Sequence, residues 1–182
     1  ACYQNCNMVF WSSKSGINSK YTFSSSPTFT SDPWSVYTGR PKSSSALGRV
    51  SLFQFDKKQF ENYLLNYGII KSKSSSQDKM LIQEAYQILK NQVNNLTKLK
   101  HPNILTVVEP IEEHSKTFLF VTEYVTDCLE SLYNNDSTNY GRFSDSGENI
   151  LSSNGASLPD NILIQRGILQ IVNALEFIHT RA

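Results

Sequence analysis

The sequence is short of charge, of cysteine and of long apolar runs. Charged residues make up 18% of its 182 residues and hydrophobic residues 39%, and both shares are low for a compact globular chain. Seventeen basic residues against sixteen acidic ones leave a net charge of +1, which gives no electrostatic footprint for DNA or RNA. No apolar run reaches the roughly 20 residues that span a bilayer. We therefore predict a modest core with long polar loops, no nucleic-acid partner and no membrane-spanning segment.

Three cysteines do not make a disulfide framework. Cys2 and Cys6 lie near the N-terminus and Cys128 stands alone. A metal site built on Cys2 and Cys6 needs two more ligands nearby, and none is there, so no metal site is predicted. Residues 8–33 also lack the apolar segment of a secretory signal. We therefore expect a reducing, cytoplasmic setting.

Polar residues dominate the first part of the chain. Residues 1–33 carry serine and threonine clusters, Pro27 and Pro33, and no periodic apolar pattern, which predicts disorder. Residues 34–37 and 49–55 then read as strands, because apolar side chains alternate along them. A turn-rich stretch separates the two strands, and together they predict an antiparallel hairpin or meander.

Helical spacing follows the two strands. Apolar residues recur every three or four positions over 57–67, and Gly68 is placed to end that helix. A second helix is predicted over 77–99, stopped by Pro102. Its apolar stripe is formed by Leu81, Ala85, Ile88, Leu89, Val93, Leu96 and Leu99.

The remaining pattern predicts a hairpin and more helix. Two apolar runs, 104–110 and 117–125, are joined by a polar turn. A short helix over 128–133 leads into a long polar insertion at 134–157. A last helix, about 158–180, has a broad apolar face that needs a packing partner. The pattern as a whole indicates an α+β fold, a small sheet lobe followed by helices.

Three blocks in the second half of the chain resemble protein kinases. Residues 96–105 (LTKLKHPNIL) are similar to the end of the kinase C-helix and the next strand. Residues 117–125 (TFLFVTEYV) are similar to the fifth strand and hinge, and residues 168–181 (ILQIVNALEFIHTR) to the E-helix. The order and spacing of the blocks imply a kinase-like N-lobe over 34–122, a hinge over 123–126 and the start of a C-lobe over 127–182.

The resemblance does not extend to the residues that handle phosphate. A working kinase needs a glycine-rich loop, a strand lysine and a C-helix glutamate. The alignment puts residues 31–35 (SDPWS) on the loop, Phe53 at the lysine and Gln92 at the glutamate. A phenyl ring cannot pair with phosphate, and the ion pair is missing at both ends. The resemblance therefore implies a pseudokinase with no catalytic residue.

One group of kinase-like proteins fits the first half as well. Residues 10–16, 34–40 and 50–58 are similar to the SCY-like pseudokinases in a fungal form, above all in the tryptophan-x-x-x-x-Gly-Arg block and in Phe53. Members of that family act as scaffolds in vesicle coat traffic. The resemblance implies clathrin, adaptor or coatomer partners and a cytoplasmic location at Golgi or endosomal vesicles. It also implies that the chain is an N-terminal fragment, without the catalytic loop and the helical repeats that follow.

A vestigial nucleotide cleft is the candidate site. The alignment gives as its lining Val36, Val50, Leu52, Thr122, Glu123 and Val125, and ordinary core or hinge packing explains these residues at least as well. Backbone groups of Glu123 and Val125 offer an edge for adenine. We predict no cofactor, with weak ATP binding left open.

Two other interpretations stay open. The first is an ATP-binding Ser/Thr kinase that uses displaced residues, with Lys42, Lys57 or Lys58 as the cation and Glu84 as its helix partner. Solvated lysines on a surface are the more common explanation of such residues. The second is an unrelated α+β binding domain that happens to contain a His-Pro-Asn turn.

Overall fold

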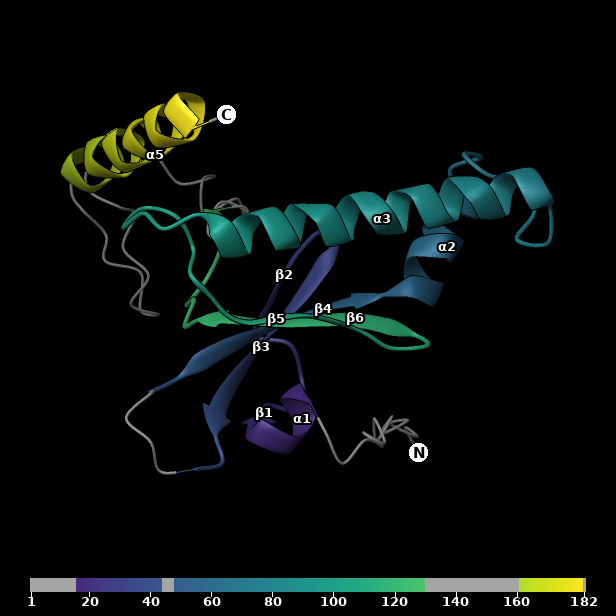
Figure 1. The fold of residues 1–182 in the computed structure, drawn as a ribbon, viewed down its shortest axis with the longest axis horizontal. Helices are drawn as coiled ribbons and strands as arrows, with labels where there is room; N and C mark the ends of the chain where they lie inside the picture. The colour runs from purple at the N-terminus through teal and green to yellow at the C-terminus, as the bar shows by residue number, and fades with distance from the viewer. Residues whose placement is uncertain (1–15, 44–47, 130–160, 182) are drawn as a thin grey trace, which may run out of the picture.

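The computed structural model describes residues 16–43, 48–129 and 161–181. An antiparallel sheet forms the centre of this part, with the long helix α3 (Ser76–Lys98) across one face and the short helix α1 (Ile17–Lys20) against the other (Figure 1). The order of the strands is β1-β3-β4-β6-β5, and β2 pairs with β3 beside β1. The strands are β1 (Tyr21–Phe23), β2 (Phe29–Ser31), β3 (Trp34–Pro41), β4 (Val50–Asp56), β5 (Val107–Glu113) and β6 (Thr117–Glu123). The α+β prediction is confirmed.

The prediction that residues 1–33 are disordered is wrong from Gly16 onward. This segment forms α1, β1 and β2, with β1 paired to the end of β3 and β2 to its beginning. Ile17, Tyr21 and Phe29 are at most 8% exposed. Three isolated apolar residues among serines and threonines give no periodic signal, yet each is buried, so composition alone missed the segment. Residues 1–15 lie outside the described part.

Two glutamates of β5 fix this N-terminal segment to the sheet. Glu109 accepts hydrogen bonds from the Lys20 ammonium at 2.9 Å and from the Tyr21 hydroxyl at 3.1 Å. Glu112 accepts from the backbone N–H of Ile17 at 2.9 Å. The bond from Glu112 gives an acceptor to a backbone N–H at the N-terminus of α1, which would otherwise lack one. The Ile17 side chain adds an apolar contact in the core.

Strand β4 is central because β3 pairs with one of its edges and β6 with the other. Successive side chains of a strand point to opposite faces. Val50 and Leu52 enter an α1-side core, and Phe55 enters an α3-side core. The buried members of the α1-side core are Ile17, Tyr21, Val50, Leu52, Leu119 and Val121. Those of the α3-side core are Phe55, Leu64, Ile70, Ile82, Tyr86 and Phe118.

Helix α2 (Lys57–Asn66) begins directly at the end of β4. The Asp56 side chain caps it by accepting from the Gln59 backbone N–H at 2.8 Å. Gly68 has φ of +68°, the left-handed conformation that ends a helix at little cost to glycine. The predicted helix 57–67 and its glycine are confirmed.

Helix α3 confirms the helix predicted over 77–99 but not the whole predicted stripe. Ile82, Tyr86 and Val93 are its buried residues, whereas Leu81 and Ile88 are 45% and 52% exposed. Apolar residues lie on two adjoining faces of α3, and Ile82 and Tyr86, which the predicted stripe leaves out, mark the face that packs on the sheet. The stripe was therefore placed about a quarter of a turn away from the true contact face.

The predicted hairpin is confirmed as β5 and β6, joined by a turn at 114–116. Its first strand starts at Val107, later than predicted, and its register with β6 shifts beside Pro110. Proline has no N–H to donate to the ladder, so a bulge accommodates it. The predicted insertion 134–157, and nearly all of the short helix 128–133, lie outside the described residues.

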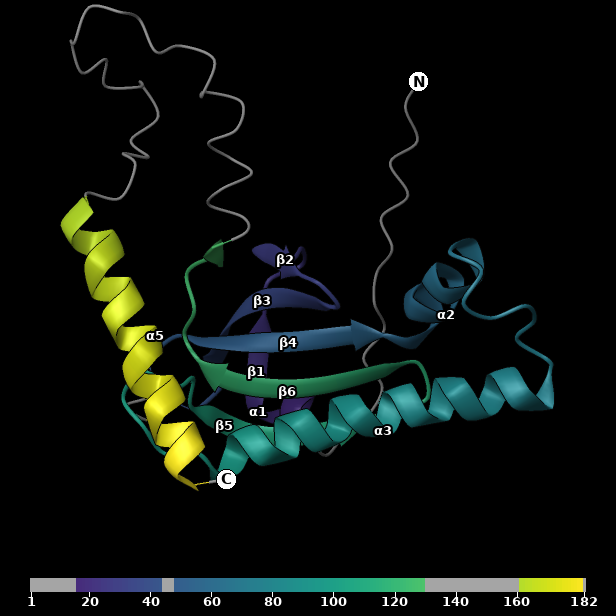
Figure 2. The same cartoon turned by 90° about the horizontal axis from the view of Figure 1, so that it is seen from above.

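Helix α5 (Asn161–Arg181) confirms the predicted last helix and lies beside the C-terminal end of α3 (Figures 1 and 2). The Phe177 ring is 4.9 Å from that of His101, and Ala174 is 9% exposed. The opposite side of α5 is apolar but at least 46% exposed, at Ile164, Ile168, Leu169, Ile171, Val172 and Leu175. In the described part of the chain, no helix is long and apolar enough to cross a membrane.

We predict that the exposed apolar side of α5 makes the purified chain self-associate. Changing Ile168 and Ile171 to Gln should reduce association with a stability change within about 0.5 kcal/mol, because both side chains are more than half exposed. Light scattering and thermal melts measure the two effects. Ala174→Gln is the control and should lower the melting temperature, since that residue is buried. A wild-type chain that stays monomeric at all concentrations contradicts the prediction.

Candidate functional site

The candidate site is the α3-facing side of the sheet where β3, β4 and β6 run together, next to the hinge that follows β6. Ladder partners point to the same face, so Val36, Phe53 and Phe120 form one row across the three strands. Ser51 and Thr122 are partners in the neighbouring row, closer to the hinge. This is the surface on which a nucleotide lies in a protein kinase, according to the alignment above.

Aromatic rings occupy the row that contains the lysine position. The Phe53 ring stacks on Phe120 with centroids 4.8 Å apart and planes at 21°. Trp34 meets Phe120 edge-on at 5.0 Å and Phe55 at 5.8 Å. Offset and edge-on contacts of this kind add to the gain from burial. The stacked rings therefore occupy the position at which a kinase has the cation that binds phosphate.

The hinge backbone is hydrogen-bonded to side chains of the sheet. The Val125 N–H donates to the Ser51 hydroxyl oxygen at 2.9 Å. The Thr122 hydroxyl donates to the Glu123 carbonyl at 2.8 Å. Ser51 and Thr122 are 1% and 0% exposed, so water does not compete for these bonds. An adenine edge that sought the Val125 donor would have to displace Ser51.

The side chain of Glu123 fixes the end of the hinge. Its carboxylate accepts from the Thr106 N–H at 2.8 Å, and its own N–H donates to the Thr106 carbonyl at 3.0 Å. These two bonds join β6 to the residue that precedes β5. The hinge is therefore anchored before it leaves the sheet.

Strands β2 and β3 are joined by a tight turn in place of a phosphate-binding loop. Ser31 is the ladder partner of Trp34, so only Asp32 and Pro33 lie in the turn. A phosphate-binding loop needs backbone N–H donors, but proline has none and the Asp32 carboxylate repels phosphate. Glycine, which lets the backbone approach phosphate closely, is absent from this turn.

The six residues that the alignment placed in the cleft are not brought together. Val36 and Thr122 lie on the α3-facing side. Val50 and Leu52 lie on the opposite side, inside the α1-side core, because their strand positions have the other parity. Glu123 and Val125 are held in the hinge bonds just described.

Ser51 is the site residue that the sequence reasoning missed. The alternation of side chains along the strand could have identified it. If Phe53 takes the lysine position, the residue two positions earlier must lie on the same face of the sheet. A serine on the buried face of a central strand needs a hydrogen-bond partner, and the hinge supplies one.

The three lysines that the open alternative offers as the cation for phosphate all lie outside strands β3, β4 and β6. The Lys42 ammonium donates to the Asn18 carbonyl at 2.7 Å, on the α1 side. Lys58 is exposed on α2. Lys57 is engaged with Glu113 and with the His114 carbonyl. On α3, Gln92 and Glu84 are both exposed, so neither forms a buried partner for a cation.

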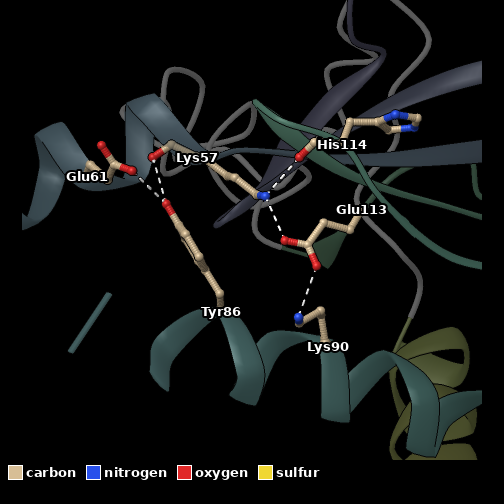
Figure 3. A network of polar contacts seen from close by, with 6 residues as sticks. All are labelled: Lys57, Glu61, Tyr86, Lys90, Glu113 and His114. Atoms are coloured by element: carbon tan, nitrogen blue, oxygen red, sulfur yellow. Dashed lines mark hydrogen bonds and ion pairs between the residues drawn. The ribbon is translucent and has the colours of Figure 1, made fainter. Parts of the chain in front are cut away.

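Lys57 belongs to a polar network between the sheet, α2 and α3 (Figure 3). Glu113 accepts from Lys57 at 2.9 Å and from Lys90 of α3 at 3.0 Å, and these bonds lower the pKa of its carboxyl. The Tyr86 hydroxyl donates to Glu61 at 2.9 Å. Burial, followed by that carboxylate, raises the pKa of Tyr86, so its hydroxyl keeps its proton at neutral pH.

Among the residues that the structure describes, no group of His, Cys, Asp or Glu is arranged to hold a metal ion. The buried polar groups near the hinge are hydroxyls and backbone amides. Their hydrogen bonds stabilise the hinge.

Comparison with known proteins gives close relatives, although no family model matches the chain. The chain is 64% identical over 177 residues to the protein kinase-like protein SCY1 of Saccharomyces cerevisiae, a match that covers 96% of the chain and 21% of the relative. It is 32% identical to the protein kinase domain-containing protein ppk32 of Schizosaccharomyces pombe, over 82% of the chain and 18% of the relative. Mouse SCY1-like protein 2 is 28% identical over 81% of the chain and 13% of the relative. The chain thus spans about a fifth or less of the length of these relatives.

We predict that Ser51→Ala destabilises the chain by about 1 kcal/mol, because the partly buried Val125 N–H loses its acceptor. Thermal or urea unfolding measures the loss. Thr38→Ala is the matched control, since Thr38 is the ladder partner of Ser51 but its hydroxyl bonds to Thr28 at an exposed position. Equal losses for the two variants would show that the hinge bond has no special weight.

Proposed function

Because the chain belongs to the SCY-like family of protein-kinase-like proteins, we propose that it forms a nucleotide-independent interaction domain that transfers no phosphoryl group. Its fold is a kinase-like N-lobe with a hinge and the beginning of a C-lobe. On this proposal the lobe is a rigid scaffold whose surfaces bind other proteins.

The observation that carries the proposal is the ring of Phe53 in the lysine position. The faces of aromatic rings carry partial negative charge, so the stacked Phe53 and Phe120 rings disfavour an anion beside them. In kinases the strand lysine and the metal ions neutralise the charge that develops on phosphate. A hydrocarbon stack supplies no such neutralisation.

The hinge supports the same conclusion from the adenine side. The single proton of the Val125 N–H is already donated to Ser51. Adenine binding would break the bond that the Val125 N–H makes to the buried Ser51 hydroxyl. Weak nucleotide binding thus carries a cost at both ends of the cleft.

We predict that ATP with Mg²⁺ shifts the melting temperature of the protein by less than the error of the measurement, and that no autophosphorylation occurs. Differential scanning fluorimetry and incorporation of labelled phosphate test the two statements. Lys42→Met and Lys58→Met decide the alternative of a displaced lysine. A clear ATP-dependent shift in the wild type that either substitution abolishes would establish that alternative and overturn the proposal.

The partners that we propose are components of vesicle coats, namely clathrin, its adaptors or coatomer, met in the cytoplasm at Golgi or endosomal vesicles. The proposal rests on the family, whose members are expected to act as scaffolds there.

We predict saturable binding of the purified chain to at least one of clathrin, an adaptor complex and coatomer, with an affinity that ATP with Mg²⁺ does not change. Surface-immobilised coat proteins and an unrelated protein of similar mass and charge as control are sufficient for the measurement. Binding to none of the three would contradict the coat proposal and leave the nucleotide proposal untouched.

A further inference from the structure

We propose that the network around Lys57 is a ligand-independent lock that holds α3 against the sheet. The inference rests on the proposed function in one respect: without a nucleotide in the cleft, some other contact has to fix the helix. In an active kinase the pair between the strand lysine and the C-helix glutamate must be in place. Here Phe53 and Gln92 occupy those positions and cannot form it.

A different lysine, Lys57, supplies a cation further along the chain. Lys57 follows Phe53 by four residues, directly after β4, so it lies about 13 Å further from the hinge at 3.3 Å per residue. Lys57 is the first residue of α2, and its ammonium lies over the Phe118 ring, which in turn stacks on Phe55. The lysine therefore acts at the far end of β4, next to the start of α2.

The donors of the Lys57 ammonium are used within the protein. One bonds to the Glu113 carboxylate at 2.9 Å and another to the His114 carbonyl at 2.8 Å. The ammonium also lies 4.4 Å from the centroid of the Phe118 ring, within the range of a cation–π contact. The Lys57 side chain is 13% exposed and that of Glu113 is 47% exposed, so water screens the ion pair mainly from the carboxylate side. Lys57 thus has a structural role, and its ammonium is not available to bind phosphate.

Two contacts carry the lock from Lys57 to α3. Glu113 bridges the ammonium groups of Lys57 and Lys90, and Lys90 lies on α3. One turn earlier on the same helix, the Tyr86 hydroxyl donates to Glu61 at 2.9 Å and contacts the Lys57 carbonyl at 3.4 Å. Figure 3 shows both side chains of α3 pointing up toward Lys57 and Glu113. The helix supplies a cation and a phenol, and the strand supplies the carboxylate.

The polarity of this arrangement is opposite to that of a kinase. The carboxylate sits on β5 and the helix carries the ammonium, so the lock needs no lysine in the cleft. Loss of the Lys57 charge removes its pair with Glu113 and its contact with the Phe118 ring, so removal of Lys57 should loosen α3 more than removal of an exposed lysine.

The test is amide hydrogen exchange of the full chain, followed by mass spectrometry. Lys57→Met keeps the aliphatic length and deletes the charge, and it should speed exchange roughly tenfold in the middle of α3 and in the turn at 114–116. Exchange in α1 should not change, because α1 lies against the other face of the sheet, nor should exchange in β1, which pairs with β3 on the side of the sheet away from β5 and β6. Lys58→Met is the matched control and should match the wild type. Lys57→Arg keeps the charge and should restore most of the protection.

Two further arms make the result decisive. If Lys57→Met does not fold, Tyr86→Phe removes one hydroxyl and should still speed exchange in α3 about threefold. Exchange in α3 that is the same in these variants as in Lys58→Met, or that rises uniformly over the chain, overturns the lock. Slower α3 exchange in the wild type on addition of ATP with Mg²⁺ would instead defeat the proposed function, and the lock would still be judged on the variants.

Discussion

The alternation of side chains along β4 is the constraint on which the rest of the structure depends. One parity of this central strand supplies Val50 and Leu52 to the α1-side core. The other parity presents Ser51, Phe53 and Phe55 to the hinge, the aromatic stack and the α3-side core in turn. A slip of one residue would exchange the two sets and would put a hydroxyl into an apolar core. The register is therefore fixed by both faces at once.

This constraint explains why the losses at the two kinase positions are compatible with a stable fold. A charge buried without its partner is more costly than a hydrocarbon of similar size. With Phe53 packed on Phe120, a carboxylate facing this stack from α3 would have no cation to pair with. Gln92 is uncharged and exposed on α3, so it needs no cation from the strand. The hydroxyl of Ser51 then satisfies the hinge donor that would otherwise remain without an acceptor.

Much of the fold could be predicted because the spacing of apolar residues and the residues at the ends of helices indicate it. Helix α2, its terminal Gly68, helix α3 and the β5–β6 hairpin all follow from spacing within a short window. What escaped prediction depends on contacts between distant residues. The N-terminal segment is ordered because Ile17 shares a buried core with Leu119 and Val121. The backbone N–H of Ile17 also donates a hydrogen bond to Glu112, 95 residues further along the chain. No local pattern encodes such a contact.

The candidate site shows the same division between local and distant information. Motif alignment identified Phe53, but it also placed Val50 and Leu52 in the cleft, where parity excludes them. The alignment is one-dimensional, whereas a cleft is lined by one face only. Conversely, the serine that closes the hinge has no motif of its own and is visible only when its face is compared with that of Phe53.

The network around Lys57 gives helix α3 a role that differs from that of the C-helix in a kinase. In a kinase the helix reports on the nucleotide, because the lysine that fixes it also contacts phosphate. Here the cation that fixes α3 is surrounded by Glu113, a backbone carbonyl and an aromatic ring, and its contacts lie away from the hinge. On the proposal made above, a helix held in this way keeps its position whether or not a ligand is present. Its outward face, with Leu81 and Ile88 exposed, is then a constant surface, which is what a scaffold requires and a switch avoids.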